Sequence, residues 1–121
     1  MSNVGEVRQQ GVKVTLNGVE RTVKYDLNSF AVLEEIYGSV DNAMKVLETG
    51  SIKAVRTILW AGLIHEELSD DGIPKISQIQ VGSWIGLGDL ETISKAVKAA
   101  MDTSTPKNKV PNSTPISDNP Q

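Results

Sequence analysis

The stretch GSIKAVRTILWAGLIHEE, residues 50–67, most constrains what this chain can fold into. It predicts one helix, capped at Ser51 and running to about Glu67, whose surface is apolar almost all the way round. Apolar residues cover more than half of the helical wheel, and Trp60 and Ile64 fall on the other side among polar residues. The segment is too short, and too charged at its flanks, to span a membrane. It therefore lies at the centre of the fold, or part of its surface is reserved for another chain.

The segment before this helix predicts a β-hairpin. Apolar and polar residues alternate from Val12 to Leu27, and the dipeptide Asn17-Gly18 interrupts the alternation. Asn-Gly supplies the two positive φ angles that a two-residue turn needs. Because a lone hairpin is marginally stable, we expect its apolar face to pack on helices or on a neighbouring subunit.

Two shorter helices are expected between the hairpin and the central helix. The first begins behind a cap at Asn28 and stops at Gly38. The second begins behind a cap at Ser39 or Asp41 and ends at Gly50. Their apolar positions recur at helical spacing and are Phe30, Leu33, Ile36, Tyr37, Val40, Ala43, Met44 and Leu47.

Two further helices are expected after a polar loop. Ser77 and Gln80 match a capping box, in which each side chain accepts a hydrogen bond from the backbone of the other. Ile76 and Val81 occupy the two positions of a hydrophobic staple, and this short helix runs to Ile85. The last helix follows the glycines of GLGD, and its cap and apolar face are Asp89, Leu90, Ile93, Val97, Ala100 and Met101.

Composition and charge argue against several classes of protein. The chain has 121 residues and a net charge of -3, and its Lys and Arg residues are scattered singly, which argues against a nucleic-acid binder. It has no cysteine, so disulfides, Cys-based zinc sites and thiol chemistry are excluded. The N-terminal MSNVGEVRQQ lacks the apolar core of a signal peptide, so we expect a cytoplasmic protein that does not bind membranes.

The sequence offers little for catalysis. His65 is the single histidine, and no second His, Cys or nucleophile motif accompanies it, so we favour a solvated histidine at a helix end over a metal ligand or general base. Ser69–Gly72 reads SDDG, which lacks the alternating ligands of a calcium loop and predicts a polar turn. GLGD has neither the third glycine nor the lysine of a phosphate loop. We therefore expect no enzyme, no catalytic or metal site and no cofactor.

The remaining candidate site is for a protein partner. Trp60 and Ile64 lie four residues apart on the partly polar face of the central helix, with Lys53 and Arg56 beside them. One interpretation is that Trp60 and Ile64 form an exposed anchor pair for a partner helix. The alternative is that Trp60 packs in the core, as we expect of Trp84.

These elements predict a mainly helical α+β fold, with an N-terminal hairpin and about five helices. The folded domain is expected over residues 12–103, after a flexible N-terminus over residues 1–11. Residues 104–121 contain prolines among Ser, Thr and Asn and cannot bury enough apolar surface to become ordered, so we expect a disordered tail. The expected core is Phe30, Leu33, Ile36, Val55, Ile58, Leu59, Leu63, Leu90, Ile93 and Val97.

Several of these motifs resemble the small tail assembly chaperones of long-tailed phages and prophages of Gram-positive bacteria. The resemblance covers residues 12–102, and its features are LEEIYGS, a short helix, GSIKAVRTILWAGLIHEE, and the closing helix pair ISQIQVGSWIGLGDLETISKAVKAAM. It implies a protein that binds the tape measure protein, a very long and largely helical chain. Such chaperones keep this client soluble in the cytoplasm of the infected host, recruit subunits of the tail tube, and are absent from the mature virion.

Two alternatives to a chaperone stay open at this stage. One is a structural tail or neck subunit that is retained in the virion, and the other is a hydrolase that uses His65. An adaptable apolar surface on an acidic body suits a chaperone of an apolar helical client.

We also expect self-association. The hairpin has two free edges and the central helix has apolar surface to spare, and both features favour contact with a neighbouring chain. Head-to-tail contacts would then give rings or a spiral along the client.

The resemblance raises one expectation about the tail. Many such chaperones are made in two lengths, because the ribosome slips back one base near the end of the short frame. The slip sequence A AAA AAC requires a codon ending in A, then Lys, then Asn, and Pro106-Lys107-Asn108 permits it. The alternative is that Pro-Lys-Asn is only part of a polar tail, and the gene sequence decides between the two.

Overall fold

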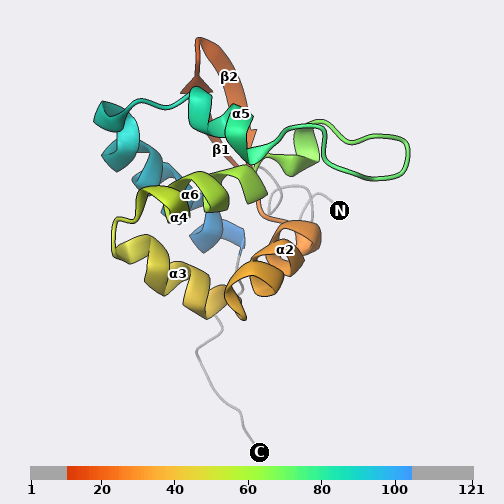
Figure 1. The fold of residues 1–121 in the computed structure, drawn as a ribbon, viewed down its shortest axis with the longest axis horizontal. Helices are drawn as coiled ribbons and strands as arrows, with labels where there is room; N and C mark the ends of the chain where they lie inside the picture. The colour runs from red at the N-terminus through yellow and green to blue at the C-terminus, as the bar shows by residue number, and fades with distance from the viewer. Residues whose placement is uncertain (1–10, 105–121) are drawn as a thin grey trace, which may run out of the picture.

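The computed structural model describes residues 11–104, which form a two-stranded antiparallel hairpin followed by five α-helices (Figure 1). The elements in chain order are β1 (Val12–Leu16), β2 (Val19–Val23), α2 (Leu27–Tyr37), α3 (Val40–Glu48), α4 (Ile52–Ala61), the 3-10 turn η1 (Ile64–Glu66), α5 (Gln78–Ser83), the 3-10 turn η2 (Leu87–Asp89) and α6 (Leu90–Ser104). The predicted mainly helical α+β fold is confirmed. The predicted flexible segment, residues 1–11, and the predicted disordered tail, residues 104–121, lie outside the described residues except for Gly11 and Ser104. Ser104 is the last residue of α6, so the tail was predicted to begin one residue too early.

The hairpin forms where the alternation predicts it. Leu16 pairs with Val19 across the turn, and Val12 pairs with Val23 at the open end. Asn17 has a φ of 52° and Gly18 a φ of 77°, which are the left-handed values of a two-residue turn that matches the twist of the strands. The hairpin packs against α6, so its apolar face is covered by this chain itself.

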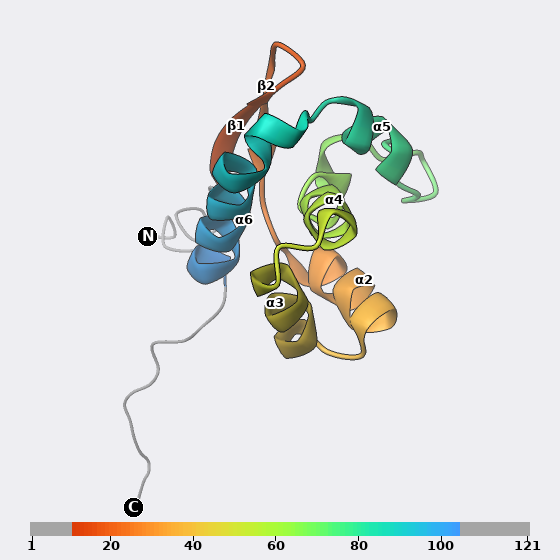
Figure 2. The ribbon, with the colours of Figure 1, turned by 60° about the vertical axis from the view of Figure 1, so that its left-hand side comes forward.

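Helix α4 is apolar on most sides because it is the central element of the fold. It contacts α2, α3, α5 and α6, and Figure 2 shows it nearly end-on among these helices. Its buried residues are Ala54, Val55, Thr57, Ile58, Leu59 and Ala61. The central position therefore explains the wide apolar face without a second chain.

The central helix ends at Ala61, earlier than the predicted end at Glu67. Gly62 lies so close to the hairpin that a Cβ atom there would come within 2.7 Å of Val23 and 2.8 Å of Tyr25. The Lys24 N–H donates a 2.9 Å hydrogen bond to the Gly62 carbonyl oxygen, so this carbonyl is bonded to the residue directly after β2. The helix thus ends where Gly62 meets the end of β2, and the chain continues as the 3-10 turn η1.

The predicted start of the first helix is wrong by two residues. Asp26, not Asn28, caps α2: its carboxylate accepts from the Ser29 N–H at 3.0 Å. The Ser29 hydroxyl is fully buried beneath this cap and lies 3.4 Å from the Asp26 backbone nitrogen. Gly38 ends α2 in the left-handed conformation with a φ of 90°, as predicted.

The caps of three other helices are confirmed. Ser39 accepts from the Asn42 N–H at the start of α3, and Ser51 accepts from the Ala54 N–H at the start of α4. The Ser77–Gln80 capping box of α5 is present in both directions. Asp89 precedes α6 as expected, but its carboxylate accepts from the Gly86 N–H at 3.2 Å, so it closes the preceding turn.

Most of the predicted core is confirmed. The residues that are buried as expected are Leu33, Val55, Ile58, Leu59, Leu63, Ile93 and Val97. Phe30 and Leu90 are only half-buried at the margin of the core. Ile36 is 46% exposed, so its placement in the core was wrong. The predicted core omitted Leu16 and Val23 of the hairpin, and Tyr25, which follows β2.

Candidate protein-binding groove

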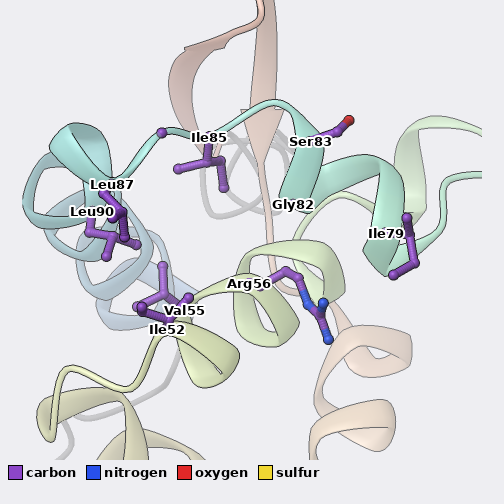
Figure 3. A pocket seen from close by; sticks show the side chains of 10 residues that line it. Ile52, Val55, Arg56, Ile79, Gly82, Ser83, Ile85, Leu87 and Leu90 are labelled. Carbon is purple, nitrogen blue, oxygen red and sulfur yellow. The ribbon is translucent and has the colours of Figure 1, made fainter.

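An apolar groove of about 380 Å³ lies between α4, α5 and the start of α6. Its lining residues are Ile52, Val55, Arg56, Ile79, Gly82, Ser83, Ile85, Gly86, Leu87 and Leu90. Figure 3 shows the side chains of Ile52, Val55, Leu87 and Leu90 gathered at one side, with Arg56 extending away from them on the side of Ile79. The groove therefore has an apolar end and an end that carries a cation.

Three large apolar side chains around the groove are open to solvent. Ile52 is 58% exposed, Ile79 is 73% exposed and Leu87 is 74% exposed. They come from α4, α5 and η2, which are separate in the sequence and converge around the groove. Exposed apolar residues are ordinary when scattered singly, but a group around a concavity is typical of a protein-binding surface.

The segment after α5 shapes the groove. The Trp84 ring lies under the guanidinium of Arg21, whose Cζ is 4.1 Å from the ring centroid, and this contact holds Trp84 against the hairpin. The chain then turns at Gly86, whose N–H donates a 3.2 Å hydrogen bond to the Asp89 carboxylate. Leu87 stands on this turn and stays exposed beside the groove.

Gly82 allows α5 to lie close to α4. A Cβ atom at Gly82 would come within 3.0 Å of the Arg56 Cδ atom and 3.7 Å of its Cγ atom. The aliphatic part of Arg56 therefore passes directly beneath α5, which fixes the direction of this side chain.

Arg56 is the charged residue among those that line the groove. Its Nε–H is buried and donates no hydrogen bond within residues 11–104, and no carboxylate in that range forms an ion pair with its guanidinium. The charge is thus partly removed from water without a compensating anion from the described part of the chain.

The predicted anchor pair on α4 is wrong, because one member is buried. Ile64 is only 4% exposed and lies in η1 rather than in the helix. Trp60 is half-buried, and its Nε1–H donates a 2.7 Å hydrogen bond to the Ile76 carbonyl. The Thr57 hydroxyl, on the same side of α4, donates to the Gln78 side chain at 2.8 Å. The face that we assigned to a partner is therefore covered by α5 and the loop before it.

Of the four predicted partner-binding residues, the structure brings Arg56 alone to the groove. Lys53 is exposed on α4 but is not part of the groove lining. Sequence reasoning missed Ile79 and Leu87. The sequence did carry a signal for them, because both are large apolar residues outside the predicted core pattern. Ile79 lies on a short helix, and Leu87 lies between two glycines.

His65 is hydrogen-bonded within the fold and is not the solvated histidine that we favoured. It is half-buried, and its Nε2 atom lies 2.8 Å from the Thr22 carbonyl oxygen, so Nε2 carries the proton and donates. The neighbouring Glu66 accepts from the Thr22 N–H at 2.8 Å and pairs with Arg21 at 3.1 Å. The side chains of η1 thus satisfy both backbone groups of Thr22.

These contacts correct the expectation of two free hairpin edges. The outer edge of β2 is covered by η1 at Thr22 and by the Gly62 carbonyl at Lys24. Within residues 11–104, no hydrogen bond covers the outer edge of β1, where the backbone groups of Lys13 and Thr15 point away from β2. One edge of the sheet therefore stays open in the part of the chain that the structure describes.

The SDDG segment forms a polar turn, as predicted. The Gly72 N–H donates to the Ser69 carbonyl at 2.8 Å, and the Ser69 N–H donates to the Ile73 carbonyl at 2.8 Å. Between Gly11 and Ser104 no group of three or more His, Asp or Glu side chains is placed to hold a metal ion. None of the helices in the same range is long and apolar enough to cross a membrane.

Comparison with known proteins finds no family model that matches the chain, and no curated protein or solved structure with significant similarity to it.

Proposed function

We propose that this protein is a non-enzymatic tail assembly chaperone that binds the tape measure protein of a long-tailed phage. In this role it keeps the client soluble in the cytoplasm of the infected bacterium and promotes polymerisation of the tail tube around it. It does not remain in the mature virion. The observation that carries the proposal is the apolar groove with its exposed Ile52, Ile79 and Leu87. The phage context rests on the resemblance of residues 12–102 to this class of chaperone.

The groove suits an amphipathic helix as its ligand. Helix recognition commonly places one apolar face of the ligand into a groove between helices, with anchors at helical spacing. Here α4 and α5 form two sides, and the segment from Ile85 to Leu90 forms the third. A groove of about 380 Å³ holds only a few side chains, which favours a weak and reversible contact with each segment of a long client.

Self-association belongs to the same proposal. Many copies must act on a client as long as a tape measure protein, and the open edge of β1 offers one surface for contact between copies. Contact with tail tube subunits is the further partner interaction that the proposed role requires.

The proposal is tested by co-expression with the tape measure protein encoded in the same phage genome. The double variant Ile79→Asp with Leu87→Asp should leave the fold intact, because both side chains are exposed, and the client should precipitate. The matched control is Leu27→Asp with Ile73→Asp, which places the same charges at residues 85% and 61% exposed outside the groove. If the groove variant keeps the client soluble as well as the control does, the groove is not the client site.

Mass spectrometry of purified particles separates a chaperone from a retained tail or neck subunit. A chaperone should be absent or far below the stoichiometry of the tail tube protein. A stoichiometric amount in the particles would contradict the proposed role. Assembly that persists after His65→Ala would argue against a hydrolase that uses this histidine.

A further inference from the structure

We infer that the client segment in the groove is an amphipathic helix that carries a carboxylate, and that this carboxylate pairs with Arg56. The inference rests on the proposed function and adds to it the chemistry by which one segment of the client is selected. The apolar part of the groove accepts many apolar helices, whereas a cation at one end selects those with an acidic residue in the matching position.

The two arginines within residues 11–104, both half-buried, show why Arg56 requires a partner. Arg21 pairs with Glu66 at 3.1 Å and lies over the Trp84 ring at 4.1 Å, so its charge is compensated within the chain. Arg56 has neither kind of contact: within residues 11–104 no carboxylate forms an ion pair with it. The Nε atoms of both arginines are buried without a hydrogen bond, so the ion pair and the ring contact are what distinguish Arg21 from Arg56. A guanidinium that is partly desolvated and unpaired gains more from a carboxylate than one that is fully hydrated.

The position of Arg56 makes it a selective contact. Its stem passes beneath α5 at Gly82, where the Cδ atom is 3.0 Å from the place of an added Cβ. This packing limits the freedom of the side chain, so less entropy is lost when a ligand binds the guanidinium. Figure 3 shows the guanidinium at the opposite side of the groove from Leu87 and Leu90.

The arrangement predicts the pattern of the ligand. A helix whose apolar residues contact Ile52, Leu87 and Leu90 would place an acidic residue of the same face, about one or two turns away, beside Arg56. No other residue of the groove lining carries a charge, so the carboxylate at that one position decides the electrostatic preference.

The test uses overlapping 20-residue fluorescein-labelled peptides that cover the tape measure protein of the same phage. Groove ligands are the peptides whose fluorescence polarisation rises with the wild-type protein and not with the Ile79→Asp, Leu87→Asp variant. Each should contain Asp or Glu on the same helical face as its apolar residues. Replacing that Glu by Gln should weaken binding about tenfold, and raised salt should weaken the parent peptide more than the Gln peptide.

Protein variants give the reciprocal measurement. Arg56→Met keeps the stem beneath Gly82 and should bind the Glu and Gln peptides with equal affinity. Arg56→Glu should weaken the Glu peptide about tenfold or more, and a Glu→Lys peptide should recover binding to it. Lys53→Glu is the matched control, because it makes the same charge change on α4 outside the groove lining and should leave the affinity within about twofold.

The outcomes separate the inference from the proposed function. If groove-dependent peptides bind and the loss of their carboxylate has no effect, the inference is wrong while the groove remains a client site. If no peptide shows groove-dependent binding, both are overturned. Because the Glu→Gln peptides are measured on the wild-type protein, the effect of the carboxylate does not depend on how the Arg56 variants fold.

Discussion

The Tyr25 hydroxyl donates a 2.6 Å hydrogen bond to the carbonyl oxygen of Ile58, 33 residues away in the sequence. Tyr25 follows β2 and Ile58 lies in the last turn of α4, so this bond joins the segment after the hairpin to the central helix. The Ile58 carbonyl also accepts from the Gly62 N–H at 3.2 Å, which is the last helical bond of α4. The tyrosine therefore contacts the helix at the point where the helix ends.

Tyr25→Phe should lower the free energy of unfolding by about 1 kcal/mol, the usual net value of one hydrogen bond. The loss stays small because the Gly62 N–H still satisfies the Ile58 carbonyl after the hydroxyl is removed. Urea denaturation followed by tryptophan fluorescence measures the change. Tyr37→Phe is the control, since the Tyr37 hydroxyl makes no hydrogen bond within residues 11–104, and an equal effect of both substitutions would contradict the role of this bond.

The titration of Tyr25 should lower the free energy of unfolding at alkaline pH. Burial raises the pKa of the Tyr25 hydroxyl far above its usual value, because the phenolate would lose its hydration in the core. The unfolded chain releases this proton near pH 10, whereas the folded chain retains it, so the folded state is favoured below that pH and loses stability above it. The difference in stability between wild type and Tyr25→Phe should therefore shrink from pH 8 to pH 11. A constant difference would contradict this linkage.

Gly62→Ala should destabilise the fold by about 1–3 kcal/mol, as overpacking of a filled site does. The added Cβ would lie 2.7 Å from a Val23 methyl group and within 2.9 Å of Tyr25, both of which are buried. Gly88→Ala is the matched control, because no atom lies within 4 Å of its added Cβ. Thermal unfolding of the two variants measures the difference, and equal melting temperatures would show that the hairpin moves aside without cost.

The sequence predicted those features that depend on neighbouring residues. Asn17-Gly18 set the hairpin turn, and the serine caps at Ser39, Ser51 and Ser77 set the starts of three helices. Each of these signals acts through backbone conformation or a hydrogen bond within a few residues, so no knowledge of the tertiary structure was needed.

The sequence did not predict features that distant segments decide. Helix α4 ends where it meets Tyr25 and Val23, and the apolar periodicity of residues 50–67 contains no information about these distant residues. The groove depends on how α5 crosses α4 at Gly82, and this crossing also covers Trp60. A helical wheel identifies which residues share a face, but it does not identify which element of the same chain covers that face.

Trp60→Ala with Ile64→Ala should destabilise the protein by several kcal/mol, because each truncation of a large core side chain costs about 2–5 kcal/mol. Ile64 is 4% exposed, and the Trp60 indole N–H donates to the Ile76 carbonyl. Ile79→Ala with Leu87→Ala is the contrasting variant: it should leave stability almost unchanged and weaken client binding. Chemical denaturation and the peptide assay are measured on both variants. A stable Trp60, Ile64 variant that loses client binding would restore the original assignment of these residues.

Glu66→Ala should open the covered edge of the hairpin. The Thr22 N–H donates to the Glu66 carboxylate at 2.8 Å, so its amide hydrogen should exchange slowly in the wild-type protein and much faster in the variant. Arg21 also loses its ion pair and is then half-buried with only the Trp84 ring beside it, which should cost a further part of the stability. Glu67→Ala is the control, because Glu67 is the exposed neighbour of Glu66. Amide exchange followed by NMR reports Thr22 directly, and equal exchange rates in the wild type and both variants would show that η1 does not protect this edge.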